Sequence, residues 1–192
     1  MELAPSAVAY LVLLLLVAAL RIVELRVSRR HQQQMAAHGA RKINDPKFKW
    51  MVLVHTLVLL GSACEVVFLK RPLIPTLATV TLLLFLAANA MRWWVIRTMG
   101  QHWNVQVVDS TQLGVVTSGP FRYVRHPNYA AVFVEMLVLP LIHTAWITAL
   151  AGSAAHILVL SQRLATEEKV LFSDARYRDA MSGKPRFLPG LF

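Results

Sequence analysis

The sequence predicts an all-α, polytopic membrane protein with about five transmembrane helices. Hydrophobic residues make up 56% of its 192 residues, and only 16% are charged. The mean hydropathy is +0.51. A soluble domain of this length carries fewer apolar and more charged side chains. The apolar residues also gather in runs of the length that a membrane-crossing helix needs, roughly 20 residues.

Three long apolar runs predict the first three membrane helices. They cover residues 3–23, 50–69 and 73–96. The third run carries Pro75 near its start, and a proline inside a helix removes a hydrogen bond and kinks or breaks it. We therefore expect the third helix to be interrupted at this proline.

Two shorter apolar runs predict a helical hairpin. Residues 129–142 and 145–160 are separated only by His143-Thr144, which favours two antiparallel helices joined by a tight turn. The alternative is one re-entrant or interfacial element, because about 10–14 apolar residues are marginal for a span. Pro140 is expected to kink the fourth helix or to end it early.

The distribution of basic residues predicts the orientation in the membrane. Lysine and arginine are concentrated in the first connector, the third connector and the C-terminal tail, whereas the second connector holds only Lys70 and Arg71. By the positive-inside rule, the N-terminus lies outside and the C-terminus in the cytosol. Anionic lipid headgroups then account for the net charge of +10, and no nucleic-acid partner is expected.

A polar motif separates the third and fourth apolar runs, from Thr117 to Tyr129. Gly119-Pro120 predicts a turn, and His126-Pro127 places a proline at a first helical position, where its missing N–H is tolerated. The free N–H groups of that helix start can bind polar ligand atoms, together with His126 and Tyr129. Arg122 and Arg125 in the same motif are typical of headgroup anchors.

A second polar motif ends the fifth helix. Arg163 and Glu167 are four residues apart and therefore share one helix face. An arginine can bind a carboxylate through two hydrogen bonds, and a glutamate can accept hydrogen bonds from a ribose diol. Taken alone, the pair also fits a plain helix-end salt bridge. Because the hairpin is short, we expect both motifs to meet in a cofactor pocket at the cytosolic boundary.

A few ionisable groups lie inside the apolar runs. Glu65, Glu135 and His55 are candidates for a functional role, because such groups are costly within a membrane. The alternative is a structural hydrogen bond between helices, from Glu65 or Glu135 to Asn89. Arg92, beside two tryptophans, is typical of an interface anchor. No metal site is expected, since no histidine or cysteine cluster has ligand spacing.

Three features, in this order and spacing, resemble the isoprenylcysteine carboxyl methyltransferase family. They are Thr117-Ser118-Gly119, Arg125-His126-Pro127-Asn128-Tyr129, and Arg163 with Glu167-Glu168. Tyr177 and the ending Arg186-Phe187-Leu188-Pro189 extend the resemblance, which covers residues 100–192. Members of this family are integral-membrane enzymes that use S-adenosyl-L-methionine. Phospholipid N-methyltransferases share a looser version of the pattern.

The resemblance implies a role for each matching residue. Arg163 would be catalytic and would face the methyl acceptor, which Glu135 would also contact. Glu167 would hold the ribose hydroxyls. The cofactor site would be completed by Gln106, Leu113, Gly114, Val115, Val116, Phe121, His126, Pro127, Asn128 and Tyr129. The chain departs from the family pattern at Phe121, where tyrosine is usual, and at Ala131, where glycine is common.

The resemblance also implies the reaction and the overall organisation. We expect one integral-membrane methyltransferase domain over residues 1–192, with membrane helices in 1–99 and the cofactor-binding connector, hairpin and tail in 100–192. The acceptor would be lipid-tailed, either an isoprenylcysteine-type carboxylate or an alkylpyrone or alkylresorcinol hydroxyl. Resemblance to the bacterial branch favours the hydroxyl and a bacterial inner membrane.

Other classes of function remain open from the sequence. One alternative is N-methylation of a phospholipid or amine, although Arg163 would repel a cationic acceptor. Another is a non-enzymatic lipid-binding protein in which the motifs only anchor the chain. A third is a transporter that uses Glu65 and Glu135 as proton relays, but the hydropathy shows no inverted repeat.

Overall fold

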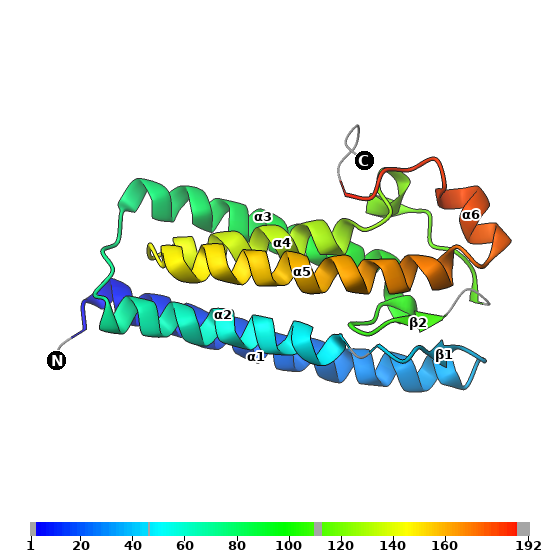
Figure 1. Ribbon diagram of the computed structural model, residues 1–192, viewed down its shortest axis with the longest axis horizontal. Helices are drawn as coiled ribbons and strands as arrows, with labels where there is room; N and C mark the ends of the chain where they lie inside the picture. The colour runs from blue at the N-terminus through cyan, green and yellow to red at the C-terminus, as the bar shows by residue number, and fades with distance from the viewer. Residues whose placement is uncertain (1–2, 46, 110–112, 188–192) are drawn as a thin grey trace.

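The computed structural model describes residues 3–45, 47–109 and 113–187. Within these residues the chain forms an elongated bundle in which α1 and α2 make one layer and α3, α4 and α5 make the other (Figure 1). The five helices are α1 (Pro5–Ala36), α2 (Phe48–Phe68), α3 (Pro75–Met99), α4 (Pro127–Leu141) and α5 (Trp146–Leu171). The predicted all-α membrane fold is confirmed.

The short elements gather at one end of the bundle, around α6 (Figure 1). They are α6 (Ala175–Met181), the 3-10 helices η1 (Gly100–His102) and η3 (Gly119–Arg122), and the strands β1 (Arg41–Lys42) and β2 (Val108–Asp109). The two strands pair antiparallel, with Lys42 opposite Val108. The sequence did not predict this small ladder, because two-residue strands have no periodic pattern.

Four of the helices are long and apolar enough to cross a membrane, and α4 is shorter, with 15 residues. Two of the long helices extend past their apolar runs: α1 continues to Ala36 and α5 to Leu171. Hydropathy marks only the part of a helix that suits lipid, whereas glutamate, arginine and glutamine continue a helix in water. The extensions matter because they carry Glu24 and the Arg163 motif.

The prolines act at helix ends. Pro75 is the first residue of α3, so the predicted interruption of that helix is wrong. A proline at a first helical position loses no hydrogen bond, because that N–H has no partner in any helix. Pro140 lies in the last turn of α4, and the hairpin then closes through Thr144, whose φ is +54° and whose hydroxyl donates to the Pro72 carbonyl at 2.6 Å.

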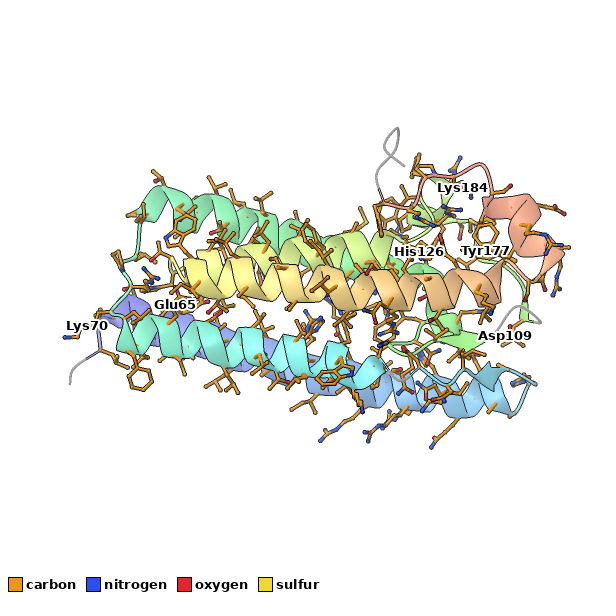
Figure 2. All side chains as sticks on the ribbon, viewed as in Figure 1. Glu65, Lys70, Asp109, His126, Tyr177 and Lys184 are labelled. Atoms are coloured by element: carbon orange, nitrogen blue, oxygen red, sulfur yellow. The ribbon has the colours of Figure 1, made fainter. Side chains whose placement is uncertain are left out.

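Glu65 has a structural role at the end of the bundle opposite to His126 and Tyr177 (Figure 2). Its carboxylate accepts hydrogen bonds from the backbone N–H groups of Ile147 and Thr148 at 3.1 and 2.8 Å. Glu65 thus caps the start of α5 from α2 and satisfies groups that a helix leaves free. Arg71 pairs with the same carboxylate at 2.7 Å, so the expected partner Asn89 is wrong.

An ionic network joins α1, α3 and α4 inside the bundle. Arg92 donates to both oxygens of Glu24, at 2.8 and 2.7 Å, and lies 3.3 Å from Glu135. Arg21 completes the network by pairing with the same two carboxylates. Arg92 is only 5% exposed, so its predicted role as an interface anchor is wrong. Glu135 pairs with arginines rather than with Asn89, whose amide donates to the Phe85 carbonyl.

Close packing of α2 against α5 depends on a glycine. A Cβ added at Gly152 would lie 2.4 Å from Cγ2 of Val58. We expect Gly152→Ala to lower the unfolding free energy by about 1–3 kcal/mol, because overpacking forces the two helices apart. Thermal unfolding in detergent measures the loss. If Gly152→Ala caused the same loss of stability in a protein that already carries Val58→Ala, a clash with Val58 could not be the cause. Ala154→Ser, on the exposed face of α5, serves as the control.

Candidate active site

A cavity of about 500 Å³ contains both polar motifs. Its lining includes most of the residues that the sequence proposed for a cofactor site: Gln106, Gly114, Val115, Val116, Phe121, His126, Pro127, Asn128, Tyr129, Arg163 and Glu167. Leu113 is half-buried beside this set but does not line the cavity. Residues of the two polar motifs therefore lie together in one cavity of the described structure, as the sequence predicted.

The first turn of α4 faces the last turns of α5. The Tyr129 hydroxyl donates a hydrogen bond to the Glu167 carboxylate. The His126 ring stacks on the Tyr129 ring with 5.6 Å between centroids, and its Nε2 lies 3.2 Å from Oε1 of Glu168. Because α4 starts at Pro127, its first turn presents these side chains at the helix entrance.

Arg163 is held in place from several sides. It donates to the carbonyl oxygen of Val105, and its Nε lies 3.5 Å from Oδ2 of Asp45. Its guanidinium also lies over the rings of Phe48 and Tyr129, at 5.8 and 5.9 Å from their centroids, as cation–π contacts do. The alternative of a plain Arg163–Glu167 salt bridge is wrong, since each residue pairs with another partner.

The C-terminal segment closes over the start of α4. The N–H groups of Arg125 and His126 donate to the carbonyls of Pro185 and Arg186 at 2.9 and 2.8 Å. Glu168 receives the Arg186 guanidinium at 2.7 Å. Figure 2 shows Lys184 and His126 at this same end of the molecule. Leu188 and Pro189, which extended the resemblance, lie outside the described residues.

Comparison with known proteins agrees with this arrangement. The family model described as the isoprenylcysteine carboxyl methyltransferase family matches residues 80–173, which include both motifs. Over these residues the chain is similar to this family. The solved structure of a eukaryotic intramembrane Ras methyltransferase, isoprenylcysteine carboxyl methyltransferase, aligns with a TM-score of 0.54 and 22% identity. The alignment covers 72% of this chain and 52% of the methyltransferase chain, so this chain spans about half the length of that protein. The likeness shows the fold.

Two bacterial proteins of similar length are related over most of the chain. An uncharacterised protein of Bacillus subtilis, YpbQ, is 28% identical over 152 residues, which is 79% of this chain and 89% of the relative. An uncharacterised protein of Haemophilus influenzae is 27% identical over 156 residues, or 81% of this chain and 90% of the relative. Both relatives share nearly their full length with this chain.

Sequence reasoning missed several residues of the cavity and its support. Arg125, expected to anchor headgroups, lines the cavity and lies 3.5 Å from Glu168, whereas Arg122 is exposed. Asp45 supports Arg163. The sequence could have pointed to this residue, because Asp45 is the only acidic residue between Glu24 and Glu65. Glu135, proposed to contact the acceptor, does not line the cavity, because the arginine network engages it.

The α6 residue Tyr177 forms another part of the wall. Its ring packs edge-on against Phe172, with 5.3 Å between centroids. Burial raises the pKa of the Tyr177 phenol above its ordinary value, so this wall stays uncharged at neutral pH. Tyr177 is one of the residues on which the family resemblance rested.

Proposed function

We propose that this protein is an S-adenosyl-L-methionine-dependent methyltransferase that acts on a lipid-tailed acceptor at the cytosolic face of a membrane. The observation that carries the proposal is the single cavity into which Tyr129, Arg163 and Glu167 all project. The two short motifs lie on different helices, α4 and α5, and residues of both line this cavity. We also propose that residues 1–192 act as one methyltransferase domain.

The polar atoms of the cavity suit this cofactor. Several buried polar atoms on lining residues have no hydrogen-bond partner among the described residues, and Oδ1 of Asn128, Nε1 of Trp103 and Nε of Arg125 are three of them. The adenine amino group of the cofactor can donate to Oδ1 of Asn128, and the carboxylate of the cofactor can accept from Nε1 of Trp103 and Nε of Arg125. Glu167 is 24% exposed at its side chain and offers a carboxylate to a ribose diol. The residues present therefore fit the group.

When bound, S-adenosyl-L-methionine supplies a methyl group that its sulfonium already makes electrophilic. The protein then has to align the acceptor and stabilise charge rather than create a nucleophile by covalent chemistry. Arg163 is suited to face the acceptor oxygen, because its contacts with Asp45 and Val105 fix the guanidinium before the acceptor arrives. Tyr129 orients the Glu167 carboxylate through its hydroxyl.

The other half of the cavity is apolar and favours a lipid-tailed acceptor. Ile22 and Leu25 of α1 and Leu59 and Leu60 of α2 line it. Ile22 and Leu60 are 51% and 58% exposed on the outer surface of the bundle, where lipid would lie. An alkyl chain could thus pass from the bilayer into the cavity between these residues while its head reaches Arg163.

The orientation is proposed from charge. Figure 2 places His126, Tyr177 and Lys184 at one end of the bundle and Glu65 and Lys70 at the other. The basic connectors and tail belong to the first end, so the positive-inside rule puts the cavity mouth and the C-terminus in the cytosol. The cytosol is also where a soluble nucleoside cofactor would enter.

Calorimetric titration of S-adenosylhomocysteine into the detergent-solubilised protein tests the proposal. We expect saturable, micromolar-range binding that weakens at least about tenfold in Glu167→Ala, the loss of about 1.4 kcal/mol or more expected for a charge-assisted hydrogen bond. Asp179→Ala, which removes an exposed carboxylate of α6, should bind as the parent does. A folded, monodisperse parent that does not bind the nucleoside would contradict the methyltransferase assignment.

A further inference from the structure

Two histidines face each other deep in the cavity. His55 of α2 and His156 of α5 lie with their ring centroids 5.4 Å apart and their planes at 37°. Both line the cavity, and His156 is fully buried, with 0% of its surface exposed. Neither residue belongs to the motifs that would hold the cofactor.

The two rings lack hydrogen bonds. Nε2 of His55 and both ring nitrogens of His156 are buried without a partner among the described residues. A buried polar group without a partner is unfavourable by roughly 1–3 kcal/mol. Other histidines of the bundle have at least one: His31 contacts the Trp103 carbonyl at 2.9 Å, and Nε2 of His143 contacts the Ser6 hydroxyl at 3.3 Å, although Nδ1 of His143 is also without a partner. The exception suggests that a ligand completes the pair.

The pair lies on the same side of α5 as the proposed reaction centre. His156 and Arg163 are seven residues apart, so they share a helix face and are separated by roughly 10 Å along the axis. Glu167 follows one turn further toward the cytosolic end. The acceptor head would therefore lie beside Arg163 on the histidine side of the cavity, and the cofactor would meet it from the Glu167 side.

Charge around the pair is arginine-rich. Arg21 of α1, Arg92 of α3 and Arg163 of α5 line the same cavity as the two histidines. The carboxylates of this region, Glu24 and Glu135, are bound by Arg21 and Arg92, and among the described residues neither forms an ion pair with either histidine. A neutral imidazole offers one donor and one acceptor nitrogen, which matches a hydroxyl group.

We propose that His55 and His156 bind the hydroxyl of a neutral, lipid-tailed phenol or enol and accept its proton during methyl transfer. The inference rests on the proposed function and specifies its acceptor. The O–H bond breaks as the proton moves to a free ring nitrogen of His156. The acceptor oxygen forms its bond to the methyl carbon while the bond from that carbon to sulfur breaks, leaving a neutral thioether.

The imidazolium then releases its proton to water, which restores the neutral ring. Arg163 stabilises the developing oxyanion. A carboxylate acceptor would arrive without a proton at neutral pH and would need no such base. The pair is therefore a reason to assign the acceptor to hydroxyl compounds rather than to prenylated carboxylates.

Binding of alkyl probes to the full-length protein tests this without turnover. The probes are pentadecylphenol, pentadecylbenzene and hexadecanoate, titrated in detergent without cofactor and followed by the ring resonances of ¹⁵N-labelled histidine. We expect the phenol to bind at least about tenfold more tightly than the alkylbenzene and to shift the resonances of both residues, as a hydrogen bond of ordinary strength would do.

The variants His156→Phe and His55→Phe should each abolish the preference for phenol over alkylbenzene. His143→Phe is the matched control, because His143 is also buried but does not line the cavity. Equal binding of phenol and alkylbenzene by the parent would overturn the proposal, and so would a preference that survives both substitutions. The parent comparison decides the matter even if one variant fails to fold.

The same samples separate this inference from the proposed function. Binding of S-adenosylhomocysteine by a protein that shows no phenol preference would contradict the histidine site alone. Phenol preference in a protein that never binds the nucleoside would contradict the methyltransferase assignment and the proton transfer together. Tighter binding of hexadecanoate than of the phenol would assign the acceptor to carboxylates and overturn the proposal.

Discussion

Arg92→Ala is expected to lower the unfolding free energy by about 3–5 kcal/mol, the usual consequence of removing one partner from a buried ion pair. Arg92 is 5% exposed and contacts Glu24 of α1 and Glu135 of α4. Without it, two carboxylates remain close together inside the bundle, with Arg21 as their common partner. The thermal midpoint of the detergent-solubilised protein should fall sharply, and α1 should separate from α3 and α4.

The control for this change lies one and a half turns further along the same helix. Arg97 is exposed, and Arg97→Ala should leave the thermal midpoint nearly unchanged. Removing both charges of one pair in Arg92→Met with Glu24→Gln should recover part of the lost stability, because Arg21 and Glu135 can still neutralise each other. An equal loss for Arg92→Ala and Arg97→Ala would contradict a structural role for the network.

This network shows what the sequence could and could not predict. Hydropathy located every long helix, because lipid demands continuous apolar runs. It also placed Arg92 at the end of such a run, beside Trp93 and Trp94, and that position is typical of an interface anchor. Partners in α1 and α4 could not be read from one sequence, since they depend on how helices far apart in the chain rotate against one another.

The candidate site was predicted to a similar extent. The His126–Tyr129 and Arg163–Glu167 motifs were visible because polar residues interrupt apolar surroundings, and the short hairpin brought them together. His156 was not visible, because a lone histidine among apolar residues has no partner pattern. Its position opposite His55 follows from the close packing of α2 and α5, which Gly152 permits.

Arg163→Ala is expected to reduce methyl transfer by about 100-fold or more while changing affinity for S-adenosylhomocysteine by less than about threefold. The reason is position: Arg163 lies beside the cavity between the Phe48 and Tyr129 rings and would meet the acceptor oxygen, whereas Glu167 would bind the ribose. Transfer of a labelled methyl group to pentadecylphenol and to a farnesylated cysteine, with titration of the nucleoside, measures both quantities.

Two further variants distinguish charge from geometry at this residue. Arg163→Lys keeps the charge but loses the planar fork and its stacking on Phe48, so it should recover little of the rate. Asp45→Asn keeps Arg163 but weakens the contact that fixes its Nε, and it should lower the turnover rate less than Arg163→Ala does. If Arg163→Ala instead lost nucleoside binding as fully as Glu167→Ala, Arg163 would belong to the cofactor site. The acceptor oxygen would then depend on the histidine pair for its binding, and His156→Phe would be the variant with the larger loss of turnover.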